Sequence, residues 1–322
     1  MTDAAFYCMS SELYFPGAVG LVNSLRVAGH REPIYLLDCG LTAPHRDALA
    51  AEATIVPAPS EAPPFLLKTI APLRHPADVM VLIDVDMVVT RPLRPLIERA
   101  AEGRVVVFKD NMDRFDPRWG PALDLGPARR RPYVSSGLVV LGGVPGREAL
   151  RLWDDRQDRV DYERSYFGAD EPGYPFLYLD QDILNAVLST SVEPERVVTL
   201  DKRLAPTPPF RRLRVTGADG LRSAYNDGTE PYVIHQFVRK PWLEPMYHGI
   251  YSRLLSRLWL GPDVPVKLPE REVPLRMRNG LVARLERRRV DVLDLARWYI
   301  RDVIPDWLQA RVASARGRVR RA

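Results

Sequence analysis

Two aspartates one residue apart end an apolar run in the segment Val79–Val89, whose sequence is VMVLIDVDMVV. A run bounded in this way is typical of a buried strand in a mostly parallel sheet, and such strands deliver functional residues at their carboxyl ends. Because side chains alternate along a strand, Asp84 and Asp86 would share one face, with Cα atoms roughly 6.5–7 Å apart. Two buried like charges are costly without a cation, so the pair predicts a divalent metal site, with solvated acids at a strand end as the alternative.

A second group of acidic side chains lies at the predicted start of an apolar helix. Residues 179–188 have the sequence LDQDILNAVL. Asp180, Gln181 and Asp182 therefore stand at a helix N-terminus, where the helix dipole stabilises negative charge. Taken alone, the cluster favours an N-cap role for Asp180 or Asp182 over a chemical one.

A histidine follows the last predicted strand, residues 232–234. A single histidine after a strand is more often structural than a metal ligand. His235, however, is followed closely by Lys240 and Trp242. The nearby lysine and aromatic side chain make it a candidate site residue.

Alternating strands and helices surround these groups and must position them. The predicted strands cover residues 4–9, 33–37, 54–56, 79–89, 104–108, 133–141 and 232–234, and the predicted helices cover 16–29, 44–53, 65–73, 91–99, 146–159 and 179–188. The first five elements follow the order β-α-β-α-β, which is typical of a parallel nucleotide-binding sheet. A long polar loop, Asp110–Pro132, interrupts the series, and loops of this length are usually functional or disordered.

Length and composition are those of a globular protein. With 322 residues, of which 46% are hydrophobic, the chain can bury one large core or two modest ones. Cys8 and Cys39 lie in or beside apolar segments, which favours reduced thiols and a cytoplasmic setting. No signal-peptide pattern, long apolar run, Walker A loop or dinucleotide-binding glycine motif is present. We therefore expect neither secretion nor a membrane-spanning helix, and neither P-loop nor nicotinamide chemistry.

The net charge of +5 is concentrated towards the C-terminus. Residues 262–322 hold 15 Lys or Arg and 8 Asp or Glu, a net charge of +7, and the rest of the chain carries −2. A nearly neutral body argues against nucleic acid as the partner of the whole fold. The basic end predicts a local contact with something anionic.

Together, the order and spacing of these motifs resemble the GT-A glycosyltransferases, and within them glycosyltransferase family 8, which includes glycogenin and bacterial lipopolysaccharide galactosyltransferases. The resemblance covers roughly residues 4–260 and is carried by the Asp-x-Asp motif, by Asp-Gln-Asp-Ile-Leu-Asn at 180–185, and by a histidine followed by Lys-Pro-Trp. It implies an α/β fold, with a single Rossmann-like GT-A domain around a mostly parallel sheet at residues 1–260. A basic helical segment at residues 261–322 would follow.

The resemblance also implies an activity. The protein would be a metal-dependent hexosyltransferase that moves a sugar from a UDP-linked nucleotide sugar, with retention of anomeric configuration. The acceptor would be a glycan, a lipid-linked glycan or another molecule. Asp84, Asp86 and His235 would hold Mn²⁺ or Mg²⁺ on the donor diphosphate. Asp180 and Gln181 would lie beside the anomeric carbon, where we expect Asp180 to stabilise the oxocarbenium ion.

The remaining substrate contacts follow from the same resemblance. Ser135, Ser136 and Gly137 stand where the family often has Asn-Ala-Gly or Asn-Ser-Gly, and four residues separate His235 from Lys240 where five, one a glycine, are common. Donor contacts are implied for Ser10, Ser11, Glu12, Lys68, Ser135, Ser136 and Lys240. Acceptor contacts are expected in the long polar loop, from Asp110, Arg114 and Trp119, since aromatic rings stack on sugars and arginines bind anionic groups.

The C-terminal segment suggests a further partner. Apolar residues between Leu281 and Leu308 approximate a helical stripe, and the chain ends in Arg316, Arg318, Arg320 and Arg321. This pattern suits an anionic bilayer surface, where each basic residue contributes about 1 kcal/mol. We expect a cytoplasmic protein that is peripheral on the inner face of the membrane, with a helix packed on the body as the alternative.

Two other classes of protein fit part of the pattern. In a phosphatase of the haloacid dehalogenase type, Asp84 would be the phosphorylated nucleophile and Asp86 the general acid and base. That motif normally follows the first strand of its domain, whereas several strands and helices precede it here. A non-catalytic binding protein with a vestigial site is the third possibility.

Overall fold

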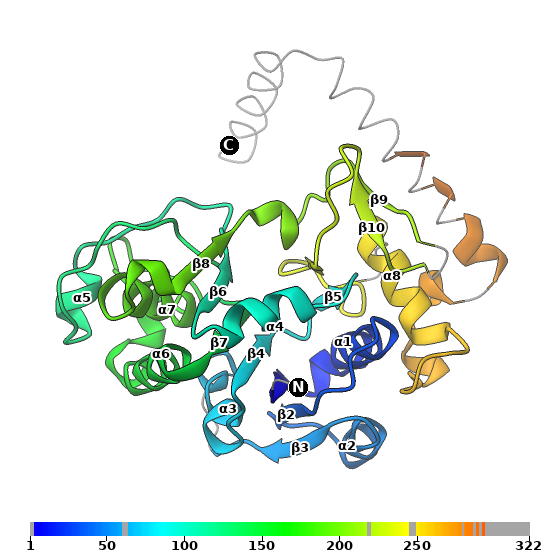
Figure 1. Cartoon of the computed structure of the whole chain (residues 1–322). Helices are drawn as coiled ribbons and strands as arrows, with labels where there is room; N and C mark the ends of the chain where they lie inside the picture. Colours follow the sequence, from blue (N-terminus) through cyan, green and yellow to red (C-terminus); the bar gives the residue numbers. More distant parts are fainter. Residues whose placement is uncertain are drawn as a thin grey trace.

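A seven-stranded sheet forms the centre of the molecule in the computed structural model, which describes residues 3–59, 64–217, 220–244, 249–278, 280–285, 288–289 and 292–293 (Figure 1). Across the sheet the strands run β3 (Thr54–Pro57), β2 (Ile34–Asp38), β1 (Ala4–Ser10), β4 (Val79–Ile83), β7 (Leu138–Gly142), β6 (Val105–Phe108) and β8 (Val197–Leu200). The α/β class and the mostly parallel sheet predicted from the sequence are confirmed.

Strand β7 is the exception to the parallel arrangement. It pairs antiparallel with both β4 and β6, whereas the other neighbouring strands pair in parallel. The carboxyl ends of the other six strands therefore meet the beginning of β7 at one edge of the sheet. Functional side chains are expected at such an edge.

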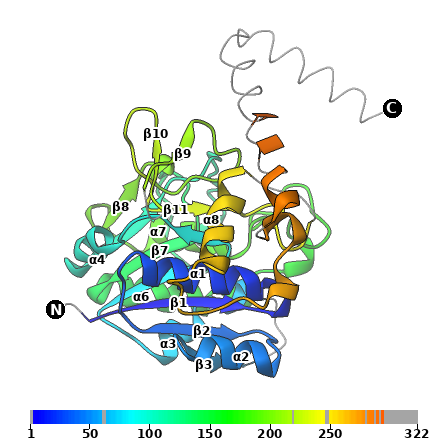
Figure 2. The same ribbon diagram turned by 90° about the vertical axis from the view of Figure 1, so that its right-hand side faces the viewer.

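Helices cover both faces of the sheet (Figure 2). Alternate residues of β1 show why: Phe6 and Cys8 lie in one buried cluster, and Ala5 and Tyr7 lie in the other. The first face packs against α1 (Phe15–Val27), α2 (Ala43–Ala50), α4 (Arg94–Ala101) and α8 (Gly249–Leu260), and the second against α3 (Ile70–Arg74), α5 (Trp119–Ala122), α6 (Gly143–Asp155) and α7 (Asp180–Thr190).

The prediction of one continuous strand over Val79–Val89 is wrong. Strand β4 ends at Ile83, and a turn follows in which Met87 N donates to Asp84 O at 3.1 Å. The chain then leaves the large sheet as β5 (Met87–Val89), which pairs antiparallel with β11 (Val233–His235) in a separate two-stranded sheet. Asp84 and Asp86 therefore lie in a turn between two sheets and do not share a strand face.

Smaller differences concern element boundaries. The strand predicted at 133–141 is shorter in the structure, where β7 begins at Leu138. The helix predicted at 146–159 corresponds to α6, which begins and ends a few residues earlier, at Gly143 and Asp155. The antiparallel hairpin of β9 (Leu213–Val215) and β10 (Ser223–Tyr225) was not predicted. Short 3₁₀ helices occupy Glu12–Tyr14, Pro64–Leu67, Gln157–Arg159, Tyr162–Arg164, Pro194–Arg196, Lys202–Leu204, Glu270–Glu272 and Leu275–Met277.

Packing on the body continues beyond α8. Asn23 of α1 is completely buried, and its amide nitrogen donates to Leu258 O and Val266 O, both at 2.8 Å. Its oxygen accepts from Val266 N at 3.0 Å. Val266 and Met277 lie in the same buried cluster as α1, so part of the segment after residue 260 shares its core, while the domain boundary at 260/261 stays a prediction.

The predicted basic helix lies largely outside the described residues, as does the group from Arg316 to Arg321. The membrane contact of this segment therefore stays a prediction. Within the described part of the chain, none of the helices has the length and apolar character needed to cross a bilayer.

The Asn23→Ala variant should be less stable by about 2–4 kcal/mol. The substitution leaves the buried carbonyl groups of Leu258 and Val266, and the N–H group of Val266, without their hydrogen-bond partner. Urea unfolding at constant pH would measure the change. Asn226→Ala, at an exposed position, is the matched control and should shift stability by about 0.5 kcal/mol or less. Equal stability of the two variants would contradict the anchoring role of Asn23.

Candidate active site

The predicted site residues come together at the edge where the parallel strands end. Ser10 ends β1, Asp84 follows β4, and Asp110 follows β6. Ser136 lies just before β7 in the same region, because β7 runs in the opposite direction. His235 reaches the site from the small sheet, where it pairs with Met87.

Lys68 connects the first aspartate with the acid at the start of α7. Its ammonium nitrogen lies 2.8 Å from Asp84 Oδ1 and 3.2 Å from Asp180 Oδ2, and it donates to Ser136 O at 3.1 Å. The Lys68 side chain is only 8% exposed, and that of Asp180 is 10% exposed. The lysine therefore fixes two carboxylates that are nearly a hundred residues apart in sequence.

Asp86 is held by a second cationic group. Lys240 donates to Asp86 Oδ2 and to Gln236 O, and His235 Nε2 lies 3.2 Å from Asp86 Oδ1. The backbone also fixes this residue, because Gln236 N and the Tyr251 hydroxyl both donate to Asp86 O, at 3.0 and 2.9 Å. Asp86 thus ties β5 to the segment that follows β11.

These side chains fit a divalent cation. One ligand atom each from Asp84, Asp86 and His235 lies within 4.8 Å of the others. Asp86 Oδ1 is buried and lies 3.2 Å from His235 Nε2, so these two atoms are close enough to bind one cation together. Two carboxylates and one imidazole form a donor set suited to Mn²⁺ or Mg²⁺, with the imidazole favouring manganese.

Glycine at position 137 leaves room for this arrangement. A Cβ atom at Gly137 would lie 2.5 Å from Met87 Cε, 2.9 Å from His235 Cε1 and 3.1 Å from Asp84 Oδ2. The Asp84 backbone is held at the same place, because its N–H donates to Gly137 O at 2.9 Å. Absence of a side chain at Gly137 therefore lets two of the predicted ligands approach each other.

The two aspartates have different protonation behaviour. Burial raises the pKa of Asp84, although the neighbouring Lys68 opposes the shift. Burial would also raise the pKa of Asp86, but His235 and Lys240 outweigh it and lower that pKa well below its ordinary value. Lys68 follows the same logic, since Asp84 and Asp180 raise its pKa despite burial. Asp86 and Lys68 are therefore both charged at neutral pH.

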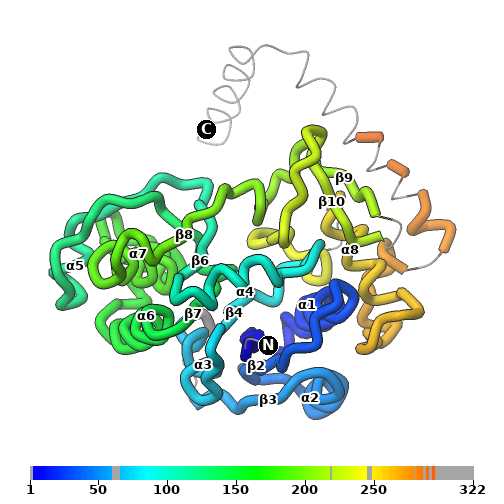
Figure 3. Tube along the Cα trace, in the orientation of Figure 1, coloured from blue at the N-terminus to red at the C-terminus, as the bar shows by residue number. Residues whose placement is uncertain are grey.

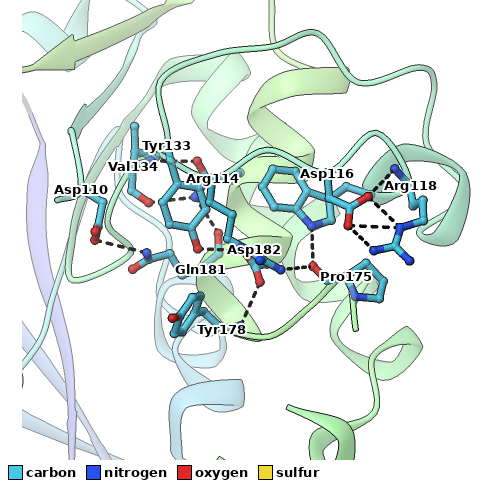
Figure 4. A network of polar contacts seen from close by, with 12 residues as sticks. Asp110, Arg114, Asp116, Arg118, Tyr133, Val134, Pro175, Tyr178, Gln181 and Asp182 are labelled. Carbon is cyan, nitrogen blue, oxygen red and sulfur yellow. Dashed lines mark hydrogen bonds and ion pairs between the residues drawn. The ribbon is translucent and has the colours of Figure 1, made fainter. Parts of the chain in front are cut away.

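Gln181 joins α7 to two loops at the sheet edge. Its side-chain oxygen accepts from Ser136 N at 3.2 Å, and its nitrogen donates to Asp110 Oδ2 at 3.3 Å. Asp110 also accepts from Met112 N through its other oxygen, at 2.9 Å. Both ends of the Gln181 amide group are thus engaged, and Figure 4 shows the contact with Asp110.

Asp182 is a structural residue. It is completely buried, and its Oδ1 accepts from Arg114 Nε at 2.9 Å and from the Tyr133 hydroxyl at 2.7 Å (Figure 4). Its Oδ2 accepts from Tyr178 N at 2.9 Å. Burial raises the pKa of Asp182, and the nearby Arg114 works against the shift. This acid therefore organises the polar loop, a role that its position beside Asp180 in the sequence conceals.

The predicted acceptor residues differ in accessibility. Trp119 is 1% exposed, and its indole N–H donates to Pro175 O at 2.6 Å. Its ring has no face open to a sugar, which removes it from the predicted acceptor contacts. Arg114 is bound to Asp182 and to Pro175 O, so of the three residues only Asp110 lies beside Gln181.

The predicted donor residues after β1 are held mainly by their neighbours. Ser10 is buried, and its hydroxyl donates to Ser11 O at 3.1 Å. Glu12 accepts from Thr42 N at 3.0 Å and contacts His45 Nδ1 at 2.9 Å. A role of these residues in binding the nucleotide stays a prediction.

Two features of the site had weak or no sequence signals. Leu179, directly before Asp180, has φ +38° and is completely buried, which is a strained conformation for a branched side chain. Gln236 is 3% exposed, and its side-chain oxygen accepts no hydrogen bond within the described residues. Gln236 follows His235 directly, and that adjacency was its only sequence signal.

Comparison with solved structures supports the fold. No family model and no curated protein matches the sequence. The structure is similar to that of an active-site mutant of LgtC, with a TM-score of 0.51 and 16% identity over 83% of this chain and 98% of that one. It is also similar to the bifunctional glycosyltransferase WbbM, with a TM-score of 0.50 and 15% identity over 82% of this chain. This chain spans 50% of WbbM. The resemblance to the GT-A fold is thus confirmed at the level of structure.

The Gly137→Ala variant should bind Mn²⁺ about tenfold more weakly or worse, because the added methyl group displaces the His235 ring and Asp84 Oδ2. Titration calorimetry with Mn²⁺ would measure the affinity. Gly126→Ala is the matched control, since a Cβ at Gly126 meets no atom within 4 Å. Parent-like Mn²⁺ affinity in the Gly137 variant would contradict the proposed position of the cation.

Proposed function

We propose that the protein is a metal-dependent glycosyltransferase that transfers a sugar from a UDP-linked donor to an acceptor, with retention of anomeric configuration. The single observation that carries the proposal is the convergence of Asp84, Asp86 and His235 at the edge of a GT-A sheet, next to the acid at the start of α7. A phosphatase of the haloacid dehalogenase type would use both Asp84 and Asp86, but it would leave His235 and the acid at the start of α7 without an evident role.

The donor diphosphate is assigned to the cation site. A divalent cation bound by the three residues would neutralise charge on the leaving diphosphate. Lys240 is almost completely buried beside Asp86, where it adds a fixed positive charge to the same region. Its contacts with Asp86 and Gln236 O hold the ammonium group in place, so it can stabilise the leaving group without reorganisation.

The sugar is assigned to the space between the cation site and α7. Lys68 lies 3.2 Å from Asp180 Oδ2 while also contacting Asp84, and this proximity of Asp180 to the cation site supports a position beside the donor sugar. The Asp180 side chain is 10% exposed, and its Oδ2 atom is paired with the Lys68 ammonium group. Such a carboxylate can stabilise positive charge that develops on the anomeric carbon, and Gln181 beside it can orient the sugar.

Binding of the donor should require both the cation and Asp86. In thermal-shift measurements with a panel of nucleotide sugars, Mn²⁺ should allow one UDP-sugar to stabilise the parent protein, and EDTA should remove the effect. Asp86→Ala should abolish this stabilisation, because one ligand and the partner of Lys240 are lost together. Asp47→Ala, at an exposed position in α2, is the matched control and should behave like the parent.

The same panel tests the reaction class. Stabilisation by none of the nucleotide sugars, together with hydrolysis of p-nitrophenyl phosphate, would favour the phosphatase. If no nucleotide sugar stabilises the protein and p-nitrophenyl phosphate is not hydrolysed, a non-catalytic binding protein is favoured. Either outcome would overturn the proposed function.

The Asp180→Ala variant should separate binding from chemistry. Donor binding should stay close to that of the parent, whereas release of UDP from the donor should fall by about a hundredfold or more, since a transition-state contact is removed. Chromatographic detection of UDP would measure the rate, again with Asp47→Ala as control. A parent-like rate in the Asp180 variant would remove this residue from the chemical step.

A further inference from the structure

A cavity of about 400 Å³ lies on the far side of the cation site from the predicted nucleotide residues. Asn111, in its wall, comes just after β6, and Lys202 and Arg203 come just after β8. Ser10, by contrast, ends β1, which lies on the other side of β4. The order of the strands therefore separates the cavity from the predicted nucleotide side.

Hydrogen bonds connect the cavity walls to the site. His235 N donates to Pro206 O at 3.0 Å, and Pro206 lines the cavity. Asn111, also in the lining, donates to the Thr207 hydroxyl at 2.5 Å, and its neighbour Asp110 accepts from Gln181. A molecule in the cavity would thus lie next to a predicted metal ligand and close to the predicted sugar site.

The lining of this cavity is strongly basic. It contains Lys202, Arg203, Arg211 and Arg212 but only one acid, Asp227. Arg203 is bound to both oxygens of Asp227, at 2.8 and 2.7 Å. Lys202 and Arg211 have no ion-pair partner among the described residues. A concave surface with several cations and so little compensation attracts an anion.

The walls are also held in shape. The Arg203 guanidinium lies over the Tyr225 ring, 4.4 Å from its centre, and Tyr225 belongs to the β9–β10 hairpin. Arg212 has φ +61°, a left-handed conformation that is unusual for a long side chain. Figure 3 shows the chain running from β8 through this basic segment to the hairpin. The cations are therefore presented by a structured connection anchored at both ends.

We propose that this cavity binds an anionic group, a phosphate or a carboxylate, carried by the acceptor. The inference rests on the proposed function and specifies its second substrate as an acidic saccharide. The donor phosphates are already assigned to the cation site and Lys240, so the basic cavity is free to bind the other substrate. A phosphate and a carboxylate would both be bound by the positive charges of Lys202 and Arg211.

Binding of small acidic sugars tests this proposal. Glucose 6-phosphate, glucuronate and glucose would be titrated into the full-length protein and followed by ligand-observed NMR. The parent should bind at least one of the two acidic sugars about tenfold more tightly than glucose. Preference for the phosphate or the carboxylate would then identify which anion the acceptor carries. Equal binding of all three sugars would overturn the proposal.

A matched pair of double variants locates the site. Lys202→Ala with Arg211→Ala should weaken binding of the preferred acidic sugar about tenfold. The control double variant, Arg99→Ala with Arg151→Ala, removes the same amount of charge from exposed positions on α4 and α6. Its affinity for the acidic sugar should be the same as that of the parent. Unchanged affinity in the first double variant, or an equal loss in both, would overturn the assignment to this cavity.

Donor binding in the same samples separates this inference from the proposed function. Mn²⁺-dependent binding of the UDP-sugar should persist in both double variants. If the donor binds but the acidic sugars do not, the anionic acceptor is overturned and the glycosyltransferase stands. If the acidic sugars bind but no nucleotide sugar does, the proposed function is overturned and the acceptor role of the cavity with it.

Discussion

Burial of three carboxylates at one sheet edge is the constraint on which the rest of the site depends. Asp84, Asp86 and Asp180 would repel one another in a poorly hydrated environment, and two buried lysines offset that repulsion. Lys68 pairs with Asp84, which follows β4, and with Asp180 at the start of α7, whereas Lys240 pairs with Asp86, which precedes β5. The position of each lysine is fixed in turn by carbonyl groups, so the backbone of two loops is part of the same charge balance.

The need to balance these charges explains why Gly137, the turn after β4 and the start of α7 lie together. The turn after β4 aims two acids at one point, and Gly137 leaves the space in which they meet His235. The start of α7 brings Asp180 to Lys68, while the next acid in the sequence, Asp182, points away and supports the polar loop. Neighbouring aspartates thus have unrelated tasks, which are decided by the side of the helix on which each one lies.

Residue chemistry could be predicted from the sequence more fully than geometry. Asp84 and Asp86 were predicted as ligands because two buried carboxylates need a cation, and His235 was added as the third ligand by the family resemblance. The structure brings the three residues together. The turn between β4 and β5 could not be predicted, because apolar residues flank it on both sides as they would in one strand. Burial of Trp119 was hidden because the residue lies in the predicted polar loop Asp110–Pro132 and its partner Pro175 is distant in sequence. The β9–β10 hairpin has strands too short to give a periodic signal.

The turn between β4 and β5 puts the cation site at the junction of the large sheet and the two-stranded sheet. Asp84 is anchored to the large sheet through Gly137, whereas Asp86 and His235 are anchored to the pair formed by β5 and β11. A cation that binds all three residues would therefore connect the large sheet with the two-stranded sheet through side chains, in addition to the turn that joins β4 to β5. The register of β5 with β11, in which His235 pairs with Met87, sets the position of His235 relative to Asp86.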